Sequence, residues 1–271
     1  MTLSDADFAT VRQLLLRESG QVLEPYRREM CALKLAQLSR AKGIDTVADL
    51  VRKLRSDDAL LRAAVEVLLN GETSFFRDPA AFRTLEREAL PALMKGQENA
   101  TSLRIWCAAC STGQEPYSVR MLLDQSPLAQ ELNVELLATD YSSPSIEKAK
   151  TGTYSQHDVN RGLPARTLAK YFKHTGRQWT VEPGLRERVR FERLNLVSGQ
   201  LPSGYWDLIL LRNVLIYFPL ETKKLILDRV LDRLAPAGLL MLGGSETTMG
   251  INEKLAPAGF GGGFFQRAAE R

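Results

Sequence analysis

The sequence LRIWCAACSTGQEPYS, residues 103–118, decides the fold of this chain. Its first seven residues are mostly apolar, and their number suits a buried strand. Small residues follow at 110–113, and a helix is expected to begin at Glu115 and Pro116, because proline suits the first helical position and an acid there complements the helix dipole. A strand, a loop of small residues and a helix are typical of the first crossover of a doubly wound α/β domain, where a ligand binds beyond the carboxyl end of the strand.

The loop in this stretch lacks the G-x-G-x-x-G pattern of a dinucleotide site, because Gly113 is its only glycine. Glu115 is also a poor neighbour for a pyrophosphate and a good one for a cation or a set of hydrogen-bond donors. S-adenosylmethionine fits this preference for cations and donors over phosphate, since it carries a sulfonium, an ammonium and ribose hydroxyls but no phosphate. The alternative is an ordinary strand-to-helix turn with an acid that complements the dipole.

The composition is that of an ordinary globular protein, with 44% hydrophobic and 25% charged residues among 271. No apolar run approaches the roughly 18 residues that span a bilayer. The first residues, MTLSDADF, lack the pattern of an export signal. Three cysteines, an odd count, fit a reducing compartment. We therefore expect a cytoplasmic protein without direct membrane insertion.

Two of the cysteines, Cys107 and Cys110, have the C-x-x-C spacing of some zinc and redox sites. The chain has no second cysteine pair and only two histidines, which argues against zinc. A redox dithiol belongs at the start of a helix, whereas Cys107 falls inside the predicted strand. We expect no metal, and a redox dithiol is the less favoured alternative.

The formal charge of +4 is unevenly distributed. Residues 150–193 hold ten Lys and Arg against four Asp and Glu, an excess of +6, which leaves −2 for the rest. A basic segment of this kind suits an acidic partner such as a nucleic acid, an anionic surface or an acidic protein. An ordinary solvated face would have the same composition, so both interpretations stay open.

The periodicity predicts three parts: a helical domain at residues 1–72, a linker with a connecting helix at 73–93, and an α/β domain at 94–271 with an insertion at about 153–193. Helices are expected at 4–15, with Ser4 as N-cap, and at 27–42, 46–54 and 57–69. The linker holds TSFFRDP at 73–79. Its phenylalanines either pack the two domains together, or Thr73 and Arg77 lie at a binding site on the domain boundary.

A second apolar strand is predicted at 134–138, and Asp140 follows it, 27 positions after Gly113. This is near the distance at which an acid holds the ribose hydroxyls of a cofactor, since a carboxylate accepts both hydrogens of a cis-diol. The alternative role is a helix cap before residues 142–144. We favour the ribose role because of the loop that precedes this strand.

Beyond this point we expect a helix at 164–172 and then a small antiparallel insertion formed by the alternating runs 178–181 and 188–191. A buried strand is predicted at 206–211, and it ends in Arg212 and Asn213, polar residues at the edge where α/β domains present functional groups. A helix at 221–234, a strand at 239–242 and a last edge strand at 261–267 complete the prediction.

Five motifs taken together resemble the chemotaxis receptor methyltransferases of bacteria, the CheR family. They are TSFFRD at 73–78, AACSTGQEPYS at 108–118, ATD at 138–140, NL at 195–196 and RNVLIYF at 212–218. The resemblance covers nearly the full length. It implies a small all-helical domain followed by a doubly wound, Rossmann-like S-adenosylmethionine-dependent methyltransferase domain with a small antiparallel β-subdomain insertion.

The resemblance also implies an activity, in which the methyl group of S-adenosylmethionine passes to glutamates on the cytoplasmic helices of chemoreceptors (methyl-accepting chemotaxis proteins). The products are glutamyl methyl esters and S-adenosylhomocysteine. We expect a monomer that does not act on nucleic acid. Of the motif residues, Arg77 and Tyr217 are assigned to catalysis, Tyr217 near the reacting sulfur. The positions assigned to the cofactor are Thr73, Arg77, Glu115, Asp140, Asn195, Leu196, Arg212 and Asn213.

Two departures from the family pattern matter. Gly71 stands where the family usually has asparagine, with Asn70 one position earlier, which puts a side-chain contact from that position in doubt. The insertion is short at 174–179, so the chain resembles members that work without a receptor's C-terminal pentapeptide tether. Arg77 is expected to orient either the cofactor carboxylate or the incoming glutamate.

Three other functions were weighed. A nucleic-acid methyltransferase on the same fold is favoured only by the basic insertion, and an aromatic base-holding motif such as N-P-P-Y is absent from the sequence. A non-catalytic adaptor that senses the cofactor would be expected to have decayed motifs, but the five motifs of this sequence are intact, which argues against that function. A nicotinamide-dependent oxidoreductase is opposed by the missing glycine pattern.

Overall fold

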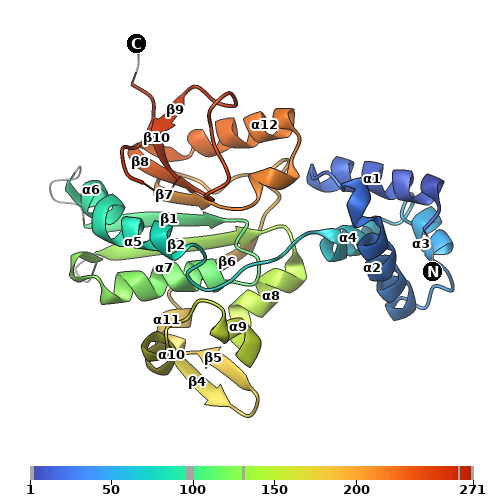
Figure 1. Cartoon of the computed structure of the whole chain (residues 1–271), viewed down its shortest axis with the longest axis horizontal. Coiled ribbons are helices and arrows are strands. Elements are labelled where there is room, and N and C mark those ends of the chain that lie inside the picture. Colours follow the sequence, from blue (N-terminus) through green and yellow to red (C-terminus); the bar gives the residue numbers. More distant parts are fainter. Residues whose placement is uncertain (1–2, 96–100, 130–131, 262, 270–271) are drawn as a thin grey trace. The chain divides into compact units, whose positions relative to one another are not determined.

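The computed structural model describes residues 3–95, 101–129, 132–261 and 263–269. The chain divides into two compact units, of which the first comprises Met1–Asn70 and Tyr217–Thr222. The second comprises Gly71–Ile216 and Lys223–Arg271 (Figure 1). Within the described ranges, no helix has both the length and the apolar character needed to cross a membrane.

The first unit is helical, as predicted. Its elements are α1 (Asp5–Ser19), η1 (Pro25–Arg27), α2 (Arg28–Ala41), α3 (Val47–Lys53) and α4 (Asp58–Leu68). The helices α1, α3 and α4 begin where short polar side chains cap them. The Ser4 hydroxyl accepts the Asp7 N–H at 3.1 Å, which confirms the predicted N-cap, and Thr46 and Asp57 cap α3 and α4 in the same way.

The second unit contains a seven-stranded sheet in the order β6-β2-β1-β7-β8-β10-β9 (Figure 1). The strands are β1 (Ser102–Ala108), β2 (Asn133–Asp140), β6 (Arg190–Arg193), β7 (Trp206–Leu211), β8 (Leu234–Leu242), β9 (Leu255–Pro257) and β10 (Phe264–Arg267). The pairs from β6 to β8 are parallel, and β10 is antiparallel to both β8 and β9. The carboxyl ends of five strands therefore meet at one edge of the sheet.

Helices connect these strands. They are α5 (Pro79–Thr84), η2 (Leu85–Ala89), α6 (Leu90–Lys95), α7 (Gln114–Gln125), η3 (Pro127–Ala129), α8 (Ser143–Thr151), η4 (Leu215–Tyr217) and α12 (Leu220–Leu231). Alternate strand residues such as Ile105, Cys107 and Leu208 join one buried core cluster with Phe82 of α5 and Met121 of α7. The two-residue period of the strands places these side chains on one face of the sheet.

A second, three-stranded antiparallel sheet has the order β3-β5-β4. It is formed by β3 (Thr153–Ser155), β4 (Phe172–Thr175) and β5 (Gln178–Val181), with α9 (Gln156–Asn160), α10 (Ala165–Tyr171) and α11 (Pro183–Arg186) around it (Figure 1). The prediction that the run at 188–191 belongs to this sheet is wrong. β6 instead pairs in parallel with β2 at the edge of the large sheet. Alternation alone cannot distinguish a half-exposed edge strand from a hairpin strand.

Two other boundaries differ from the prediction. β8 already begins at Leu234, so residues 236–238 lie within the strand rather than in a turn before it. The last predicted strand, 261–267, is observed as β10 from Phe264, and residue 262 lies outside the described residues. β10 is not an edge strand, because β9 pairs with its outer side.

Candidate functional site

The loop between β1 and α7 has an unusual backbone. Ala109, Ser111 and Gly113 all have positive φ angles, of 58°, 50° and 93°. Only glycine adopts this region readily, so two of the three positions are strained and must be held by their surroundings. The Cys110 N–H donates to the Thr139 carbonyl of β2 at 2.9 Å. The loop is therefore fastened to the neighbouring strand at the edge where the parallel strands end.

Asp140, at the end of β2, fixes the same loop from its other side. Its Oδ2 accepts the Ser111 N–H at 2.8 Å, and its Oδ1 accepts the Ser142 N–H at 2.9 Å. Both carboxylate oxygens therefore accept a backbone N–H, one from the first loop and one from the residues after β2. Asp140 thus combines the predicted position with a structural task that the sequence did not indicate.

Glu115, in the first turn of α7, forms an ion pair with Arg212, which follows β7. Arg212 Nη1 lies 2.9 Å from Glu115 Oε2, and the two side chains are 1% and 12% exposed. Burial raises the pKa of Glu115, and the positive charge of Arg212 opposes this rise. Arg212 also donates to the Arg77 carbonyl at 2.9 Å. Its guanidinium therefore holds Glu115 and the backbone of the 71–78 segment together.

The 71–78 segment is packed within the second unit. The Ser111 hydroxyl donates to the Gly71 carbonyl at 2.7 Å, and the Phe76 N–H donates to the Ser118 hydroxyl at 2.9 Å. The Phe75 ring meets those of Tyr154 and Phe172 edge-on, with centroids 5.0 and 5.5 Å apart. The contacts that fix this segment are thus with the sheet unit itself.

Two predicted residues in this segment are less tightly held. Thr73 is half-buried, and Arg77 donates from Nη1 to the Glu72 carbonyl at 2.9 Å. At Gly71, a Cβ atom would lie 3.2 Å from the Ser111 hydroxyl. The position thus takes part in the loop through its carbonyl oxygen, and a side chain there would press on Ser111.

The loop after β7 is organised by Glu246, which the sequence analysis missed. Its Oε2 accepts the N–H groups of Asn213 and Gly243 at 2.7 and 2.8 Å, and its Oε1 accepts those of Val214 and Leu215 at 2.9 and 2.7 Å. Asn213 has a positive φ of 56°. The sequence does contain a signal for this role of Glu246, because this acid lies four residues beyond the end of β8, the strand next to β7.

Asn195 and Leu196 lie in the turn after β6, beside Asp140. The Leu194 N–H donates to the Asp140 carbonyl at 2.8 Å, which joins the two strand ends. Asn195 Oδ1 accepts the Val197 N–H at 2.9 Å, and Leu196 is buried with its carbonyl accepting from Arg229 at 2.9 Å. The fold thus brings this turn, the first loop and Asp140 to one place.

Tyr217 belongs to the first unit. Its hydroxyl accepts a hydrogen bond from the Asn70 amide, and its carbonyl accepts the Val22 N–H at 2.9 Å. These contacts place Asn70, the residue beside the unusual Gly71, next to the tyrosine that the family resemblance assigns to catalysis.

Two buried tyrosines form hydrogen bonds near the site, one with the first loop and one with α8. The Tyr154 hydroxyl donates to the Thr112 carbonyl and the Tyr117 hydroxyl to the Ala149 carbonyl, both at 2.7 Å. Burial raises the pKa of both phenols. It also raises the pKa of Cys107 and Cys110, both free thiols, so these groups are disfavoured as thiolate nucleophiles.

The donor set fits S-adenosylmethionine. Two carboxylates lie near the carboxyl ends of neighbouring parallel strands: Glu115 in the first turn of α7 and Asp140 as the last residue of β2. The Ser111 N–H that could have faced a phosphate is already bonded to Asp140. Acids at these positions suit a cationic ligand with hydroxyl donors and disfavour a pyrophosphate. When bound, this group would supply an electrophilic methyl on a sulfonium.

Comparison with known proteins agrees with this chemistry. Residues 71–260 match the family model described as "CheR methyltransferase, SAM binding domain", and residues 6–69 match "CheR methyltransferase, all-alpha domain". Chemotaxis protein methyltransferase 1 of Pseudomonas aeruginosa is 38% identical over 91% of this chain and 92% of its own length. Chemotaxis protein methyltransferase Cher2 of Pseudomonas putida is 34% identical over 93% and 94%.

A solved structure with a weaker likeness is the glycopeptide N-methyltransferase MtfA complexed with S-adenosyl-L-methionine. It is 12% identical and covers 56% of this chain and 48% of its own, with a TM-score of 0.34, too low to support an inference. The two family matches together span nearly the whole chain and include the helical unit as well as the sheet. The chain therefore belongs to the CheR family of chemotaxis methyltransferases, enzymes that use S-adenosylmethionine.

Proposed function

We propose that this chain methylates glutamate side chains of chemoreceptors, giving glutamyl methyl esters and S-adenosylhomocysteine. The observation that carries the proposal is the pair of acids after β1 and β2, Glu115 and Asp140, in a site whose cysteines are buried thiols. Such a site can hold a cationic methyl donor but offers no activated thiolate. The acceptor must therefore arrive already nucleophilic.

A glutamate meets this requirement, because its unperturbed pKa of about 4.3 leaves it ionised at neutral pH. No general base is needed. The residues of the chain have to hold the carboxylate oxygen in line with the methyl carbon and exclude water. As the new O–C bond forms, the electron pair of the C–S bond goes to sulfur and opposite charges neutralise. A dry, weakly polar site favours this step over the separated ions.

Specific roles follow from the contacts. We assign the ribose hydroxyls to Asp140, which lies at the end of β2 beside the first loop, and the cationic amino-acid end of the cofactor to Glu115. Arg212 is assigned to holding Glu115 rather than to direct contact, since its side chain is 1% exposed. The remaining cofactor positions are assigned as lining residues: Thr73, Asn195, Leu196 and Asn213.

Arg77 and Tyr217 are proposed to position the reacting groups. Arg77 uses one guanidinium N–H on the Glu72 carbonyl, and the fork that remains can orient a carboxylate. Replacing Arg77 by glutamine distinguishes its two candidate partners. A rise in the KM for receptor alone assigns it to the glutamate, and a loss of S-adenosylhomocysteine affinity in calorimetry assigns it to the cofactor.

The receptor is proposed to dock by charge. Basic side chains of α2, such as Arg28, Lys34 and Arg40, and those of the insertion would attract an acidic receptor helix and raise its association rate. In the insertion, Arg166 and Arg177 are exposed. Six of the ten basic residues at 150–193 form internal ion pairs, which reduces the charge available to any acidic partner. The direct turn between β4 and β5, residues 176–177, supports tether-independent action.

The proposal is tested by incubating the protein with methyl-labelled S-adenosylmethionine and a receptor cytoplasmic fragment. We expect label on the receptor that mild base releases as methanol, because methyl esters hydrolyse readily. A receptor fragment with glutamine at the labelled positions, and Asp140→Ala enzyme, serve as controls and should show no label. Base-stable label, or label found only on added RNA, would contradict the proposed substrate. Equal labelling of receptors with and without their C-terminal pentapeptide is expected if no tether is used.

A further inference from the structure

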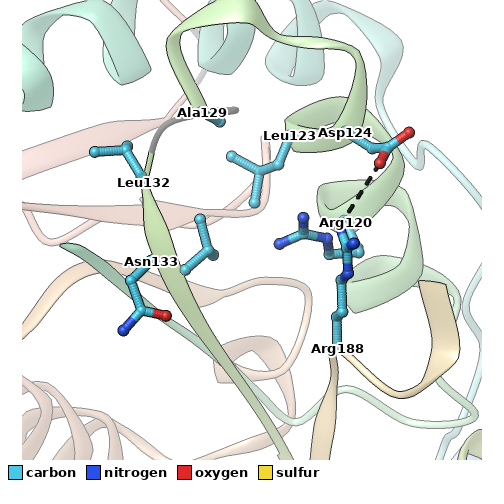
Figure 2. Close-up of a pocket in the computed structure, with 8 residues that line it drawn as sticks. Arg120, Leu123, Asp124, Ala129, Leu132, Asn133 and Arg188 are labelled. Carbon is cyan, nitrogen blue, oxygen red and sulfur yellow. Dashed lines mark ion pairs between the residues drawn. The ribbon is translucent and has the colours of Figure 1, made fainter. Parts of the chain in front are cut away.

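A polar pocket lies in the second unit at the far end of β2 from Asp140. It has a volume of about 410 Å³ and is lined by the second half of α7, Ala129 of η3, residues 132–134 at the start of β2, and Arg188 (Figure 2). Val134 lines it, six residues before Asp140, so the two ends of the strand are about 20 Å apart. The pocket is thus separate from the proposed cofactor site.

Arg120 gives this pocket its chemistry. The residue is only 7% exposed, and its Nε atom is buried without a hydrogen-bond partner among the residues that the structure describes. Figure 2 shows its side chain extending from α7 toward β2. A buried N–H donor without a partner is costly and rare in folded proteins. Arg120 also lines the pocket, so the outer part of its guanidinium can donate to a ligand that accepts hydrogen bonds.

The charges around the pocket favour an anion. Arg188 Nη1 lies 3.9 Å from Asp124 Oδ1 (Figure 2), and the same carboxylate accepts hydrogen bonds from the Tyr171 hydroxyl at 2.8 Å and the Lys170 ammonium at 3.3 Å. Among the described lining residues, Asp124 is thus accompanied by the guanidinium groups of Arg120 and Arg188. Burial, together with the nearby charge of Arg188, lowers the pKa of Arg120, and the charge of Asp124 opposes this effect.

Apolar side chains form another part of the lining, which also includes Asn133: Leu123, Ala129, Leu132 and Val134. Such a wall suits the organic part of a ligand, while two guanidinium groups suit the oxygens of a phosphate, which they can bind in fork geometry. The two guanidinium groups outnumber the single carboxylate among the described lining residues, which favours an anion. We propose that this pocket is a binding site for a small organic phosphate, held by Arg120 and Arg188. The inference goes beyond the proposed methyl transfer and does not depend on it.

The test uses the full chain saturated with S-adenosylhomocysteine, so that the cofactor site does not compete. Phenyl phosphate, inorganic phosphate and benzoate are titrated in separate calorimetric experiments at constant ionic strength. We expect phenyl phosphate to bind most tightly, because it alone combines a dianion with an apolar body. The Arg188→Gln variant should weaken its binding at least about tenfold, the loss expected for a charge-assisted hydrogen bond.

Arg166→Gln is the matched control, since it removes the same charge from an exposed position of α10 outside the pocket. It should change the affinity less than about twofold, as a surface charge does. The Arg120 Nε–H resonance, assigned by Arg120→Lys, should shift on addition of phenyl phosphate. Absence of binding, equal weakening by both glutamine variants, an unmoved Arg120 resonance, or tighter binding of benzoate would each overturn the proposal. Arg188 is largely exposed, so its replacement tests the site without disturbing the core.

Discussion

The buried pair of Glu115 and Arg212 allows a sharp test of how the site is held. Its atoms are 2.9 Å apart, and the side chains are 12% and 1% exposed. Removing one partner of a buried pair leaves an uncompensated charge and costs about 3–5 kcal/mol. Arg212→Met keeps most of the side-chain volume against Phe82, whose ring lies 5.6 Å from the guanidinium carbon. The measured loss therefore reports charge rather than a cavity.

The loss of folding stability in Arg212→Met should also depend on pH. Burial already raises the pKa of Glu115, and Arg212 opposes that rise, so its removal raises the pKa further. A carboxyl whose pKa is higher in the folded than in the unfolded state favours folding below its unfolded pKa of about 4.3, and this contribution disappears as the pH rises through the folded value. The penalty of Arg212→Met should therefore be larger at pH 8 than at pH 5.

The assay is urea unfolding followed by tryptophan fluorescence. Trp106, Trp179 and Trp206, the chain's three tryptophans, all belong to the second unit, so the signal reports that unit alone. A double-mutant cycle with Glu115→Gln should give a coupling energy of about 2 kcal/mol or more, because either single change leaves a buried charge. A penalty below about 1 kcal/mol for Arg212→Met, or additive single changes, would refute the reasoning. Arg166→Met is the surface control.

Three further predictions concern other carboxylates. Asp140→Asn should abolish S-adenosylhomocysteine binding in calorimetry while the fold survives with a loss of about 1–3 kcal/mol, since one backbone N–H loses its acceptor; unchanged affinity would rule out the ribose assignment. Glu246→Gln should destabilise the second unit by about 2 kcal/mol in urea unfolding for the same reason, and a loss below about 0.5 kcal/mol would contradict this. Ser155→Ala removes the capping box of α9 and should cost about 1 kcal/mol at pH 7. Burial acts to raise the pKa of Asp158, but the hydrogen bonds with Ser155 and the charge of Lys148 outweigh this effect and lower the pKa. The stability lost in Ser155→Ala should therefore shrink as the pH falls through the pKa of Asp158 in the folded state. A loss that does not change with pH would show that Asp158 is not involved.

Much of the site could be predicted because its signals are local. The strand, loop and helix at 103–118 follow from periodicity and from small residues, and β1 and α7 are observed within two residues of their predicted starts. Asp140 could be placed by counting, since the second parallel strand brings its end beside the first. Arg212 was found because polar residues at strand ends are exceptional. Their partners could not be found in this way.

The rest depends on contacts between segments far apart in the chain. Glu246 is 31–33 residues from three of its four N–H donors, and only the neighbouring positions of β7 and β8 bring them together. The same dependence on distant contacts explains why the strand β6 was assigned to the wrong sheet. Its run alternates as a hairpin strand would, and only the pairing with β2 shows that it extends the large sheet. The Arg120 pocket has no motif at all, because Arg120 and Arg188 meet through the fold.

The acids of the site share one arrangement that bears on how such a site works. Asp140 and Glu246 each accept N–H groups from the loops after parallel strands, and those loops contain residues with positive φ, Ser111 and Asn213. The strain is therefore balanced by charge-assisted hydrogen bonds within the protein itself. A loop held in this way does not need a ligand to set its shape, so little ordering is required when the cofactor binds. The two carboxylates thus act as anchors of the backbone at the edge where the parallel strands end.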